Sequence, residues 1–385
     1  MVARVGKGGR VKFPEDVPTL TDGVVTLRAH RESDVPGLLE QATDPVTVEW
    51  TTVPVPSSEE SSRHYATRVL PAGWEDGTSW AFAVEAADAD GVARFCGTVE
   101  LRDLGAQRAE LAYGAHPDAR GRGVMERACR LLLGWGFETR RLETVIWWAN
   151  KGNWASRRLA WRLGFSMDGE LRRWLPQRGA LLDAWVGVLL HGEPREPRGP
   201  WFDVPRINGP TVSLRQFRDS DAPRVVEACS DEQTVYWLAT MPVPYTSEHA
   251  LGFFEERRER CASGAGISWA VADAGTDLLL GWISLFDVQL GRCAEVGYWA
   301  HPDARGRGVM TQACRLAARH AFVPVEDGGL GLRRLEARHA EGNIGSQRVI
   351  ERTGFVYAGR QRATATLRDG KTVDHLVYDL LAEEL

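Results

Sequence analysis

An internal repeat limits what this chain can fold into more than any other feature of its sequence. The decapeptide HPDARGRGVM occurs at residues 116–125 and again, without a change, at residues 301–310, an offset of 185 residues (301 − 116). Solenoid repeats are only about 20–50 residues long, whereas a unit of this size can bury a hydrophobic core of its own. The repeat therefore predicts two copies of one domain, joined head to tail.

Matches outside the decapeptide extend the repeat over nearly the whole of each half. Glu110 and Tyr113 recur as Glu295 and Tyr298 at the same offset. Downstream, an Asn-x-x-Ser pair and a Gly-Phe pair recur in the same order, at an offset of 190 residues (343 − 153) because the second copy has extra loop residues. The order of these matches is what a duplicated domain requires.

The segment between the copies, residues 191–200, is charged and rich in Pro and Gly, a composition that resists both helix and strand. We therefore expect a first domain over residues 1–193, a linker over residues 194–205 and a second domain over residues 206–385.

Hydrophobic periodicity predicts the same order of elements in each copy. In the first copy we expect strands near residues 24–28, 80–85, 94–101, 109–115, 145–148, 165–173 and 183–190, and helices over residues 34–42, after residue 60, from residue 121, and over residues 153–163. An antiparallel meander followed by helix, strand, helix and two strands indicates an α/β (α+β) fold. Each domain should be a mixed, mostly antiparallel sheet flanked by helices.

Composition excludes several classes of protein. The six cysteines form no C-x-x-C pair, which argues against a disulfide framework and a thiolate zinc site, so no metal is expected. No stretch approaches the ~20 apolar residues of a membrane span, and the amino terminus lacks the apolar run of a secretory signal. The formal net charge of −5 lacks the basic excess of a nucleic-acid-binding protein. We expect a cytoplasmic globular protein without membrane or nucleic-acid partners.

The repeated Arg-Gly-Arg-Gly-Val-Met segments, residues 120–125 and 305–310, lie where a strand gives way to a helix. Unpaired backbone N–H groups and the helix dipole meet at such a point, and glycine lets an anion approach the main chain closely. Neither the Lys-Ser/Thr of a nucleoside-triphosphate loop nor the third glycine of a dinucleotide fingerprint is present. The segments predict an anion site, with a tight turn that binds nothing as the alternative.

Taken in order, these segments resemble the GNAT superfamily of N-acetyltransferases, and in particular its RimJ/RimL-like branch. The resemblance rests on Ala-Glu-x-x-Tyr in a strand, the Arg-x-x-Gly loop, Asn-x-x-Ser and Gly-Phe, all present in both halves. It implies acetyl-CoA as cosubstrate and, as acceptor, a primary amine on a small molecule or at a polypeptide amino terminus. The family prefers a small residue where Met125 and Met310 stand.

The resemblance also implies which residues bind the cofactor. The backbone of residues 122–125 and 307–310 would hold the pyrophosphate, the Arg120 and Arg305 side chains would assist, and an asparagine would contact the pantetheine arm. The expected residues are Arg120, Gly121, Arg122, Gly123, Val124, Met125 and Asn153 in the first copy, and Arg305, Gly306, Arg307, Gly308, Val309, Met310 and Asn343 in the second. For the two asparagines, simple helix capping is the alternative.

Amine acylation needs a neutral nucleophile, so a carboxylate beside the acceptor is the expected general base. Glu110 and Glu295, on the strand before the loop, fit this role, with a solvent-facing glutamate as the alternative. In the family this strand splays from its neighbour to receive the pantetheine, and its free N–H groups would polarise the thioester carbonyl.

The departing thiolate needs a proton donor that differs from the general base. Many relatives use a tyrosine on the later helix, but Ala160 and Ile350 stand at that position. The resemblance places Ser156 and Ser346 near the thioester sulfur, so these serines or solvent would donate the proton. We expect Tyr113 and its counterpart in the second copy to pack in the core.

Two questions concern the acceptor and the roles of the halves. Trp50 and Trp237 precede Pro-Val-Pro segments in a region that covers the acceptor in the family, so they could wall the amine pocket, with core packing as the alternative. One half could instead be an inactive acyl-CoA-binding or scaffolding module. The two copies could also form a pseudo-dimer within a single monomer.

Overall fold

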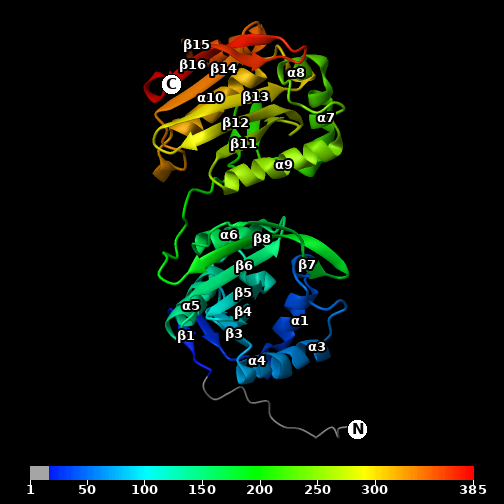
Figure 1. Cartoon of the computed structure of the whole chain (residues 1–385), viewed down its shortest axis with the longest axis vertical. Coiled ribbons are helices and arrows are strands. Elements are labelled where there is room, and N and C mark those ends of the chain that lie inside the picture. Colours follow the sequence, from blue (N-terminus) through cyan, green and yellow to red (C-terminus); the bar gives the residue numbers. More distant parts are fainter. Residues whose placement is uncertain (1–16) are drawn as a thin grey trace. The chain divides into compact units, whose positions relative to one another are not determined.

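The computed structural model describes residues 17–385, which fold as two compact units divided between Arg198 and Gly199 (Figure 1). This division lies inside the expected linker. The linker packs against the units rather than hanging free. Arg198 Nε donates a hydrogen bond to the Gly164 carbonyl at 2.7 Å, and Phe202 N donates to the Cys261 carbonyl at 2.9 Å.

The first unit contains an eight-stranded sheet in the order β1-β2-β3-β4-β5-β6-β8-β7. Of the described neighbours only β5 and β6 run parallel. Its strands are β1 Leu20–Thr21, β2 Val25–Arg28, β3 Ser79–Ala87, β4 Ala93–Gly105, β5 Arg108–Ala115, β6 Thr144–Asn150, β7 Gly169–Gln177 and β8 Ala180–Leu190. Its helices are α1 Val35–Thr43, α2 Pro45–Trp50, α3 Glu59–His64, α4 Leu70–Asp76, α5 Val124–Glu138 and α6 Trp154–Arg162.

The second unit repeats this topology in the order β15-β16-β14-β13-β12-β11-β10-β9, with β13 and β14 parallel. Its strands are β9 Ile207–Asn208, β10 Val212–Arg215, β11 Gly266–Asp273, β12 Leu279–Gln289, β13 Cys293–Ala300, β14 Arg334–Ala340, β15 Val356–Thr366 and β16 Thr372–Leu381. Its helices are α7 Ala222–Ser230, α8 Glu232–Trp237, α9 Ser247–Ala262, α10 Val309–Phe322 and α11 Ile344–Thr353. The predicted fold, two tandem domains with mixed, mostly antiparallel sheets, is confirmed.

Helices α2 and α8 were not predicted, because six residues are too few to show a helical period. Each begins at an aspartate cap: Asp44 accepts a hydrogen bond from Thr47 N, and Asp231 accepts one from Thr234 N. These two caps also contact the glycine loops, as described below.

Strand β4 separates the hydrophobic core from a polar face. Val99 and Leu101 are fully buried in the core that includes α5. Because side chains alternate along a strand, Thr98, Glu100 and Arg102 point to the opposite face, where α1 and α3 lie. The sheet thus offers a polar surface to whatever binds between it and these two helices.

The two parallel pairs are short. Strands β5 and β6 pair only over residues 108–110 with 144–146, and β13 and β14 only over residues 293–296 with 334–337. On their other side β6 and β14 pair with β8 and β16 over their whole length, whereas beyond the parallel stretches β5 and β13 have no described strand partner on the side of β6 and β14. A strand inside a sheet makes backbone hydrogen bonds to a neighbour on each side. Where β5 and β13 separate from their parallel neighbours, the N–H and C=O groups on that side are therefore free to bind another partner.

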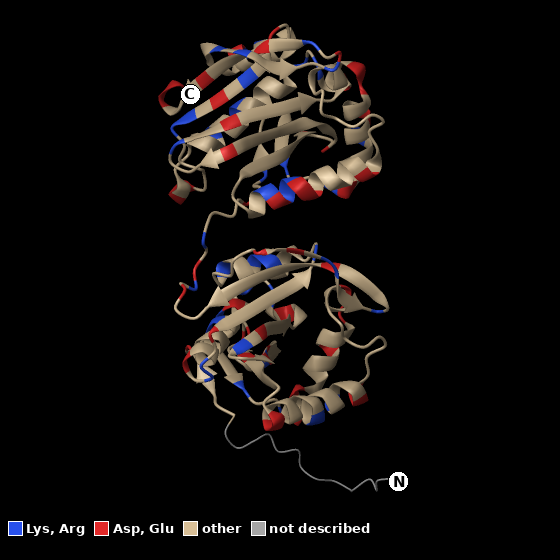
Figure 2. Cartoon of the chain, viewed as in Figure 1, with Lys and Arg blue, Asp and Glu red and all other residues tan. Residues whose placement is uncertain are grey.

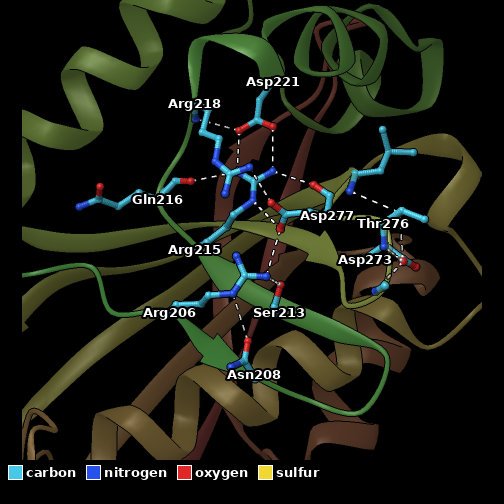
Figure 3. A network of polar contacts seen from close by, with 12 residues as sticks. Arg206, Asn208, Ser213, Arg215, Gln216, Arg218, Asp221, Asp273, Thr276 and Asp277 are labelled. Atoms are coloured by element: carbon cyan, nitrogen blue, oxygen red, sulfur yellow. Dashed lines mark hydrogen bonds and ion pairs between the residues drawn. The ribbon is translucent and has the colours of Figure 1, made fainter.

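A buried arginine ties the first long strand of each unit to the helix that follows. In the second unit, Arg215 donates to Asp221 at 2.8 Å and to Asp277 at 3.1 Å (Figure 3). The side chains of Arg215 and Asp221 are only 4% and 6% exposed. In the first unit Arg28 binds Asp34 in the same way. Both arginines are buried with their counter-charges, as a charge in a protein interior must be.

The surface carries charges of both signs, and the cysteines form no disulfide among the described residues. Acidic and basic residues are interspersed over both units, and α9 carries both signs near its C-terminal end, over residues 255–260 (Figure 2). All six cysteines lie within the described residues and are free, and five of them are buried. Among residues 17–385, no helix has the length and apolar character needed to cross a membrane.

Candidate active sites

Both glycine loops adopt the backbone that their sequence suggested. Gly121, Gly123, Gly306 and Gly308 all have φ between 71° and 76°, a left-handed conformation that favours glycine. A Cβ at any of the four would meet no described atom within 4 Å, so the space in front of the loops is open. Gly123 and Gly308 begin α5 and α10, and no described side chain caps either helix. The first-turn N–H groups are thus available to an anion.

The side chains of Arg120 and Arg305, expected to assist at the anion, each bind the aspartate cap of a short helix. Arg120 binds Asp44 and the Thr47 hydroxyl, and Arg305 makes the same contacts with the cap of α8. The hydrogen bond from Arg120 is the main reason that the pKa of Asp44 lies below its ordinary value. These arginines therefore join each loop to a short helix, and an anion would meet the loop backbone.

Met125 and Met310, larger than the family prefers, are accommodated by glycines in the neighbouring strands. A Cβ at Gly97 would lie 3.1 Å from Met125 Cε, and a Cβ at Gly281 would lie 3.1 Å from the Met310 sulfur. Both methionines therefore reach toward the sheet, where a glycine leaves room for them.

The Asn-x-x-Ser segments show the capping contact. Asn153 Oδ1 accepts a hydrogen bond from Ser156 N at 3.1 Å, and Asn343 and Ser346 repeat this distance. The serine hydroxyls make a second contact, described next.

A tyrosine hydroxyl lies close to the hydroxyl of each of these two serines. Ser156 Oγ is 2.7 Å from the Tyr113 hydroxyl, and Ser346 Oγ is 3.0 Å from the Tyr298 hydroxyl. The rings pack against the core as predicted, but the hydroxyls reach these serines. Burial raises the pKa of both tyrosines, so each keeps its proton at neutral pH and can donate it. Sequence reasoning missed this pair, although the Glu-x-x-Tyr spacing in both copies was a signal.

Glu110 and Glu295 lie where the parallel strands separate, and each is held by an arginine. Arg102 donates to Glu110 at 3.1 Å, and Arg338 donates to Glu295 through Nε at 2.8 Å. Their side chains are 13% and 26% exposed, so neither glutamate is a freely solvated surface group.

In the second unit a cleft of about 570 Å³ gathers most of the expected residues. Its lining includes Arg305, Gly306, Gly308, Val309, Met310, Asn343 and Ser346. Tyr298 and Trp237 also line it, whereas Arg307 and Glu295 are not among the lining residues. This volume falls in the range of small-molecule sites, and it joins the loop to the Asn-x-x-Ser helix.

In the first unit a cavity of about 300 Å³ opens on the polar face of the sheet. Gln41, Thr98, Glu100 and Arg102 line it, with the Thr51–Pro54 segment across it. Pro54, of the first Pro-Val-Pro segment, and Tyr113 line this cavity, but none of the residues expected to be catalytic or to bind the cofactor does. Sequence reasoning missed it because its polar side chains are scattered over two helices and two strands without a motif. Trp50 is not in its wall and instead packs on Gly152 at the turn before Asn153.

Comparison with known proteins agrees with this geometry. The family model described as "Acetyltransferase (GNAT) domain" matches residues 25–166 and again residues 211–356. The Bacillus subtilis (strain 168) proteins named "Probable N-acetyltransferase YjcK" and "Putative ribosomal N-acetyltransferase YdaF" are 29% and 30% identical over 180 and 174 residues. These matches cover 46% and 44% of this chain and 96% and 88% of the relatives.

Among solved structures, "Mycobacterium smegmatis RimJ in complex with CoA-disulfide" is 24% identical, with a TM-score of 0.42. It covers 47% of this chain and 90% of its own. The family model, in contrast, matches both halves of the chain. The chain therefore belongs to the GNAT family of acetyl-CoA-dependent N-acetyltransferases and carries one such domain in each half.

Proposed function

We propose that this enzyme acetylates a primary amine by direct attack on acetyl-CoA, with a glutamate as general base. One observation carries the proposal. In each unit a strand separates from its parallel neighbour and leads to a glycine loop, and no described side chain caps the helix that begins there. Six free cysteines suit a reducing compartment, which supports a cytoplasmic location.

The residues present fit acetyl-CoA. The loop backbone at residues 121–125 and 306–310 would hold the pyrophosphate, because its left-handed glycines leave open space there. The unpaired edges of β5 and β13 would pair with the amide groups of the pantetheine arm, and Asn153 and Asn343 would contact the same arm. Bound in this way, acetyl-CoA supplies an activated acetyl group.

The protein's part in the reaction is to move two protons. Glu110 or Glu295 would take a proton from the attacking nitrogen as the C–N bond forms. As the C–S bond breaks, the Tyr113 or Tyr298 hydroxyl, hydrogen-bonded to Ser156 or Ser346, would give a proton to the sulfur. The products would be the N-acetylated amine and CoA.

The acceptor class is suggested by a relative. YdaF is named a ribosomal N-acetyltransferase, which favours a polypeptide amino terminus over a free small amine as the acceptor. A small-molecule amine remains within the proposal because fold alone does not name a substrate.

A second candidate function concerns the second unit alone, as an acyl-CoA-binding or scaffolding module without transfer. Trp282, Phe286 and Trp299 lie on its sheet at the positions that Thr98, Arg102 and Gly114 hold in the first unit. Trp282 and Trp299 are buried in a cluster with Phe217 and Phe254. These aromatic rings fill the region that is a polar cavity in the first unit.

The test is to block each loop separately. Gly123→Asp and Gly308→Asp each place a carboxylate where the pyrophosphate would lie, so each should remove one of two acetyl-CoA sites in a calorimetric titration. Gly91→Asp, at an exposed turn glycine with a similar φ of 79° and open space around it, is the matched control. The proposal fails if both loop variants bind acetyl-CoA like Gly91→Asp, or if the wild type releases no thiol from acetyl-CoA with any of a panel of primary amines.

A further inference from the structure

The cleft of the second unit has a positively charged lining. Arg305, Arg348 and Arg352 line it, and none of the described residues in its lining is acidic. The charge of Arg305 is compensated, because its guanidinium binds Asp231 and donates to Gln233 Oε1 at 3.0 Å. The excess positive charge therefore comes from Arg348 and Arg352, which both lie on α11.

Neither of these two guanidiniums has a counter-charge. Both residues are exposed, and no described residue forms an ion pair or a hydrogen bond with either side chain. A third guanidinium lies at the same end of α11, because Arg315 NH2 donates to the Arg352 carbonyl at 2.5 Å. Guanidinium groups form their strongest hydrogen bonds with phosphate and carboxylate, so arginines gathered without an acidic partner suit an anionic ligand.

In the first unit the corresponding arginines share a carboxylate. Glu126, in the first turn of α5, accepts a hydrogen bond from Arg130 NH2 at 2.9 Å, and its other oxygen lies 3.4 Å from Arg162 NH1. Arg162 is the last residue of α6. Its contact with Glu126 shows that a guanidinium at this point reaches the first turn of the helix that follows the glycine loop.

The second unit keeps these arginines and lacks the carboxylate. Arg315 and Arg352 match the two arginines of the first unit at the offsets of 185 and 190 residues, whereas Thr311 stands where the first unit has Glu126. Thr311 lines the cleft and carries no charge. One difference in sequence thus gives the first unit an internal ion-pair cluster and leaves the second with arginines that are available to a ligand.

The position of the arginines indicates which anion they suit. Arg352 is six residues beyond Ser346 (352 − 346), about 9 Å along the helix axis, so it lies away from the proposed thioester site. The pyrophosphate has its proposed site at the loop backbone, which leaves the guanidiniums for a further group. Coenzyme A carries such a group on the 3′-oxygen of its ribose, a phosphate monoester with a charge of about −1.5 to −2 at pH 7.

We propose that Arg348 and Arg352 bind the 3′-phosphate of the cofactor and make the second unit selective for coenzyme A over 3′-dephospho-coenzyme A, whereas the first unit binds both forms alike. The inference rests on the proposed function, which places a pyrophosphate at each loop, and it adds a difference in nucleotide specificity between the halves. In the first unit Glu126 already occupies the Arg162 guanidinium.

Calorimetric titration of the full chain with one site blocked tests this specificity. Gly123→Asp leaves the second site and Gly308→Asp leaves the first, and each chain is titrated with acetyl-CoA and with its 3′-dephospho form. In the Gly123→Asp chain the dephospho form should bind about tenfold more weakly, the size of one hydrogen bond to a charged group. In the Gly308→Asp chain the two forms should bind within about twofold of each other.

An arginine variant locates the effect. In the Gly123→Asp chain, Arg352→Gln should weaken acetyl-CoA binding about tenfold and leave binding of the dephospho form within about twofold. The matched control is Arg319→Gln, which removes the charge of an exposed arginine on α10 that does not line the cleft.

Exchanging the residue that differs between the units should exchange the specificity. In the Gly123→Asp chain, Thr311→Glu should abolish the preference for the 3′-phosphate, because the new carboxylate would pair with Arg352. In the Gly308→Asp chain, Glu126→Thr should create a preference, because it releases two arginines from their ion pairs.

The outcomes separate this inference from the proposed function. It is supported if Arg352→Gln removes the preference for the 3′-phosphate and Arg319→Gln keeps it. It is overturned if the second site binds both forms equally, if Arg352→Gln weakens both forms to the same extent, or if this variant weakens only succinyl-CoA, which would assign the arginines to an acyl carboxylate. If Arg352→Gln does not fold, Thr311→Glu decides by the same comparison. The proposed function fails on a different result, namely that neither loop variant loses an acetyl-CoA site.

Discussion

The two units have the same glycine loop and differ on the face of the sheet covered by the helices that follow the first strands. The decapeptide containing the loop is identical in both, and the φ angles of its glycines differ by no more than 5°. On the other face, the first unit has a cavity lined by Gln41 and Glu100, whereas the second has a buried cluster with Trp282 and Trp299. Each half can therefore be expected to hold acetyl-CoA. At the positions of Gln41, Glu100 and Arg102, however, the second unit has Ala228, Ser284 and Phe286.

The difference between the two units also affects their stability. The buried aromatic rings on this face stabilise the second unit, because each ring removes a large apolar area from water. The first unit forgoes that stabilisation and leaves a buried amide oxygen unpaired. A polar cavity of this kind is a cost to stability that substrate binding would offset.

The largest expected difference between the units is in turnover when one loop is blocked. Gly123→Asp should reduce amine acetylation by about 10³-fold, because it removes cosubstrate from the unit that has the polar cavity. Gly308→Asp should leave the rate within about twofold, even though it abolishes one binding site. Steady-state thiol release with a hydrophilic amine measures both. Equal losses in the two variants would show that both halves turn over and would break the comparison.

The next effect is on stability and should be similar in both units. Asp34→Asn and Asp221→Asn each leave a buried arginine without its full counter-charge, at a cost of about 3 kcal/mol. Each loss should stay within its own unit, because each pair links a strand to the helix that follows it in the same unit; Figure 3 shows the pair of the second unit. Hydrogen exchange followed by mass spectrometry of the full chain reports each unit separately. Equal loss of protection in both units after a single substitution would contradict this expectation.

The pH dependence of the stability of the first unit follows from the Arg28–Asp34 pair. Burial pushes the pKa of Asp34 upward, but hydrogen bonds from Arg28 and from Arg31 N lower it by more, so the pKa in the folded state lies below the unfolded value. The stabilisation is therefore present above the unfolded pKa of about 3.9 and is lost as the pH falls through the folded value. Asp34→Asn should flatten the fall in first-unit protection below about pH 4.

A smaller difference is expected at the phenols. Tyr113→Phe should lower kcat by about 10- to 100-fold, because it removes the proton donor beside Ser156. Tyr298→Phe, its counterpart in the second unit, should leave kcat unchanged if only the first unit transfers acetyl. Acetyl-CoA affinity should not change in either variant, and a parallel fall in affinity would indicate a packing role for the ring.

The sequence predicted the parts of the molecule that depend on local pattern. The duplication, the order of strands and helices, and the glycine loops were all visible, because turns and periodicity are properties of neighbouring residues. The polar side chains of the first-unit cavity were not visible as a group. Gln41 and Glu100 lie 59 residues apart (100 − 41), and only sheet register and helix packing bring them to one face. Likewise, nothing local showed that Arg120 would bind Asp44 or that Tyr113 would reach Ser156.

The smallest effect concerns one hydrogen bond that only the first unit has. Trp147 Nε1 donates toward Ser156 Oγ at 3.1 Å and toward the Tyr113 hydroxyl at 3.2 Å, while Ala337 holds the corresponding place in the second unit. Trp147→Phe keeps an aromatic ring in the core and removes the donor, which is worth about 1 kcal/mol. We expect a fall in kcat of about fivefold, with KM for the amine unchanged. In a double-mutant cycle with Tyr113→Phe, the two losses of kcat should not add, because both substitutions act on the same proton donor. Full additivity would mean that Trp147 acts on packing alone.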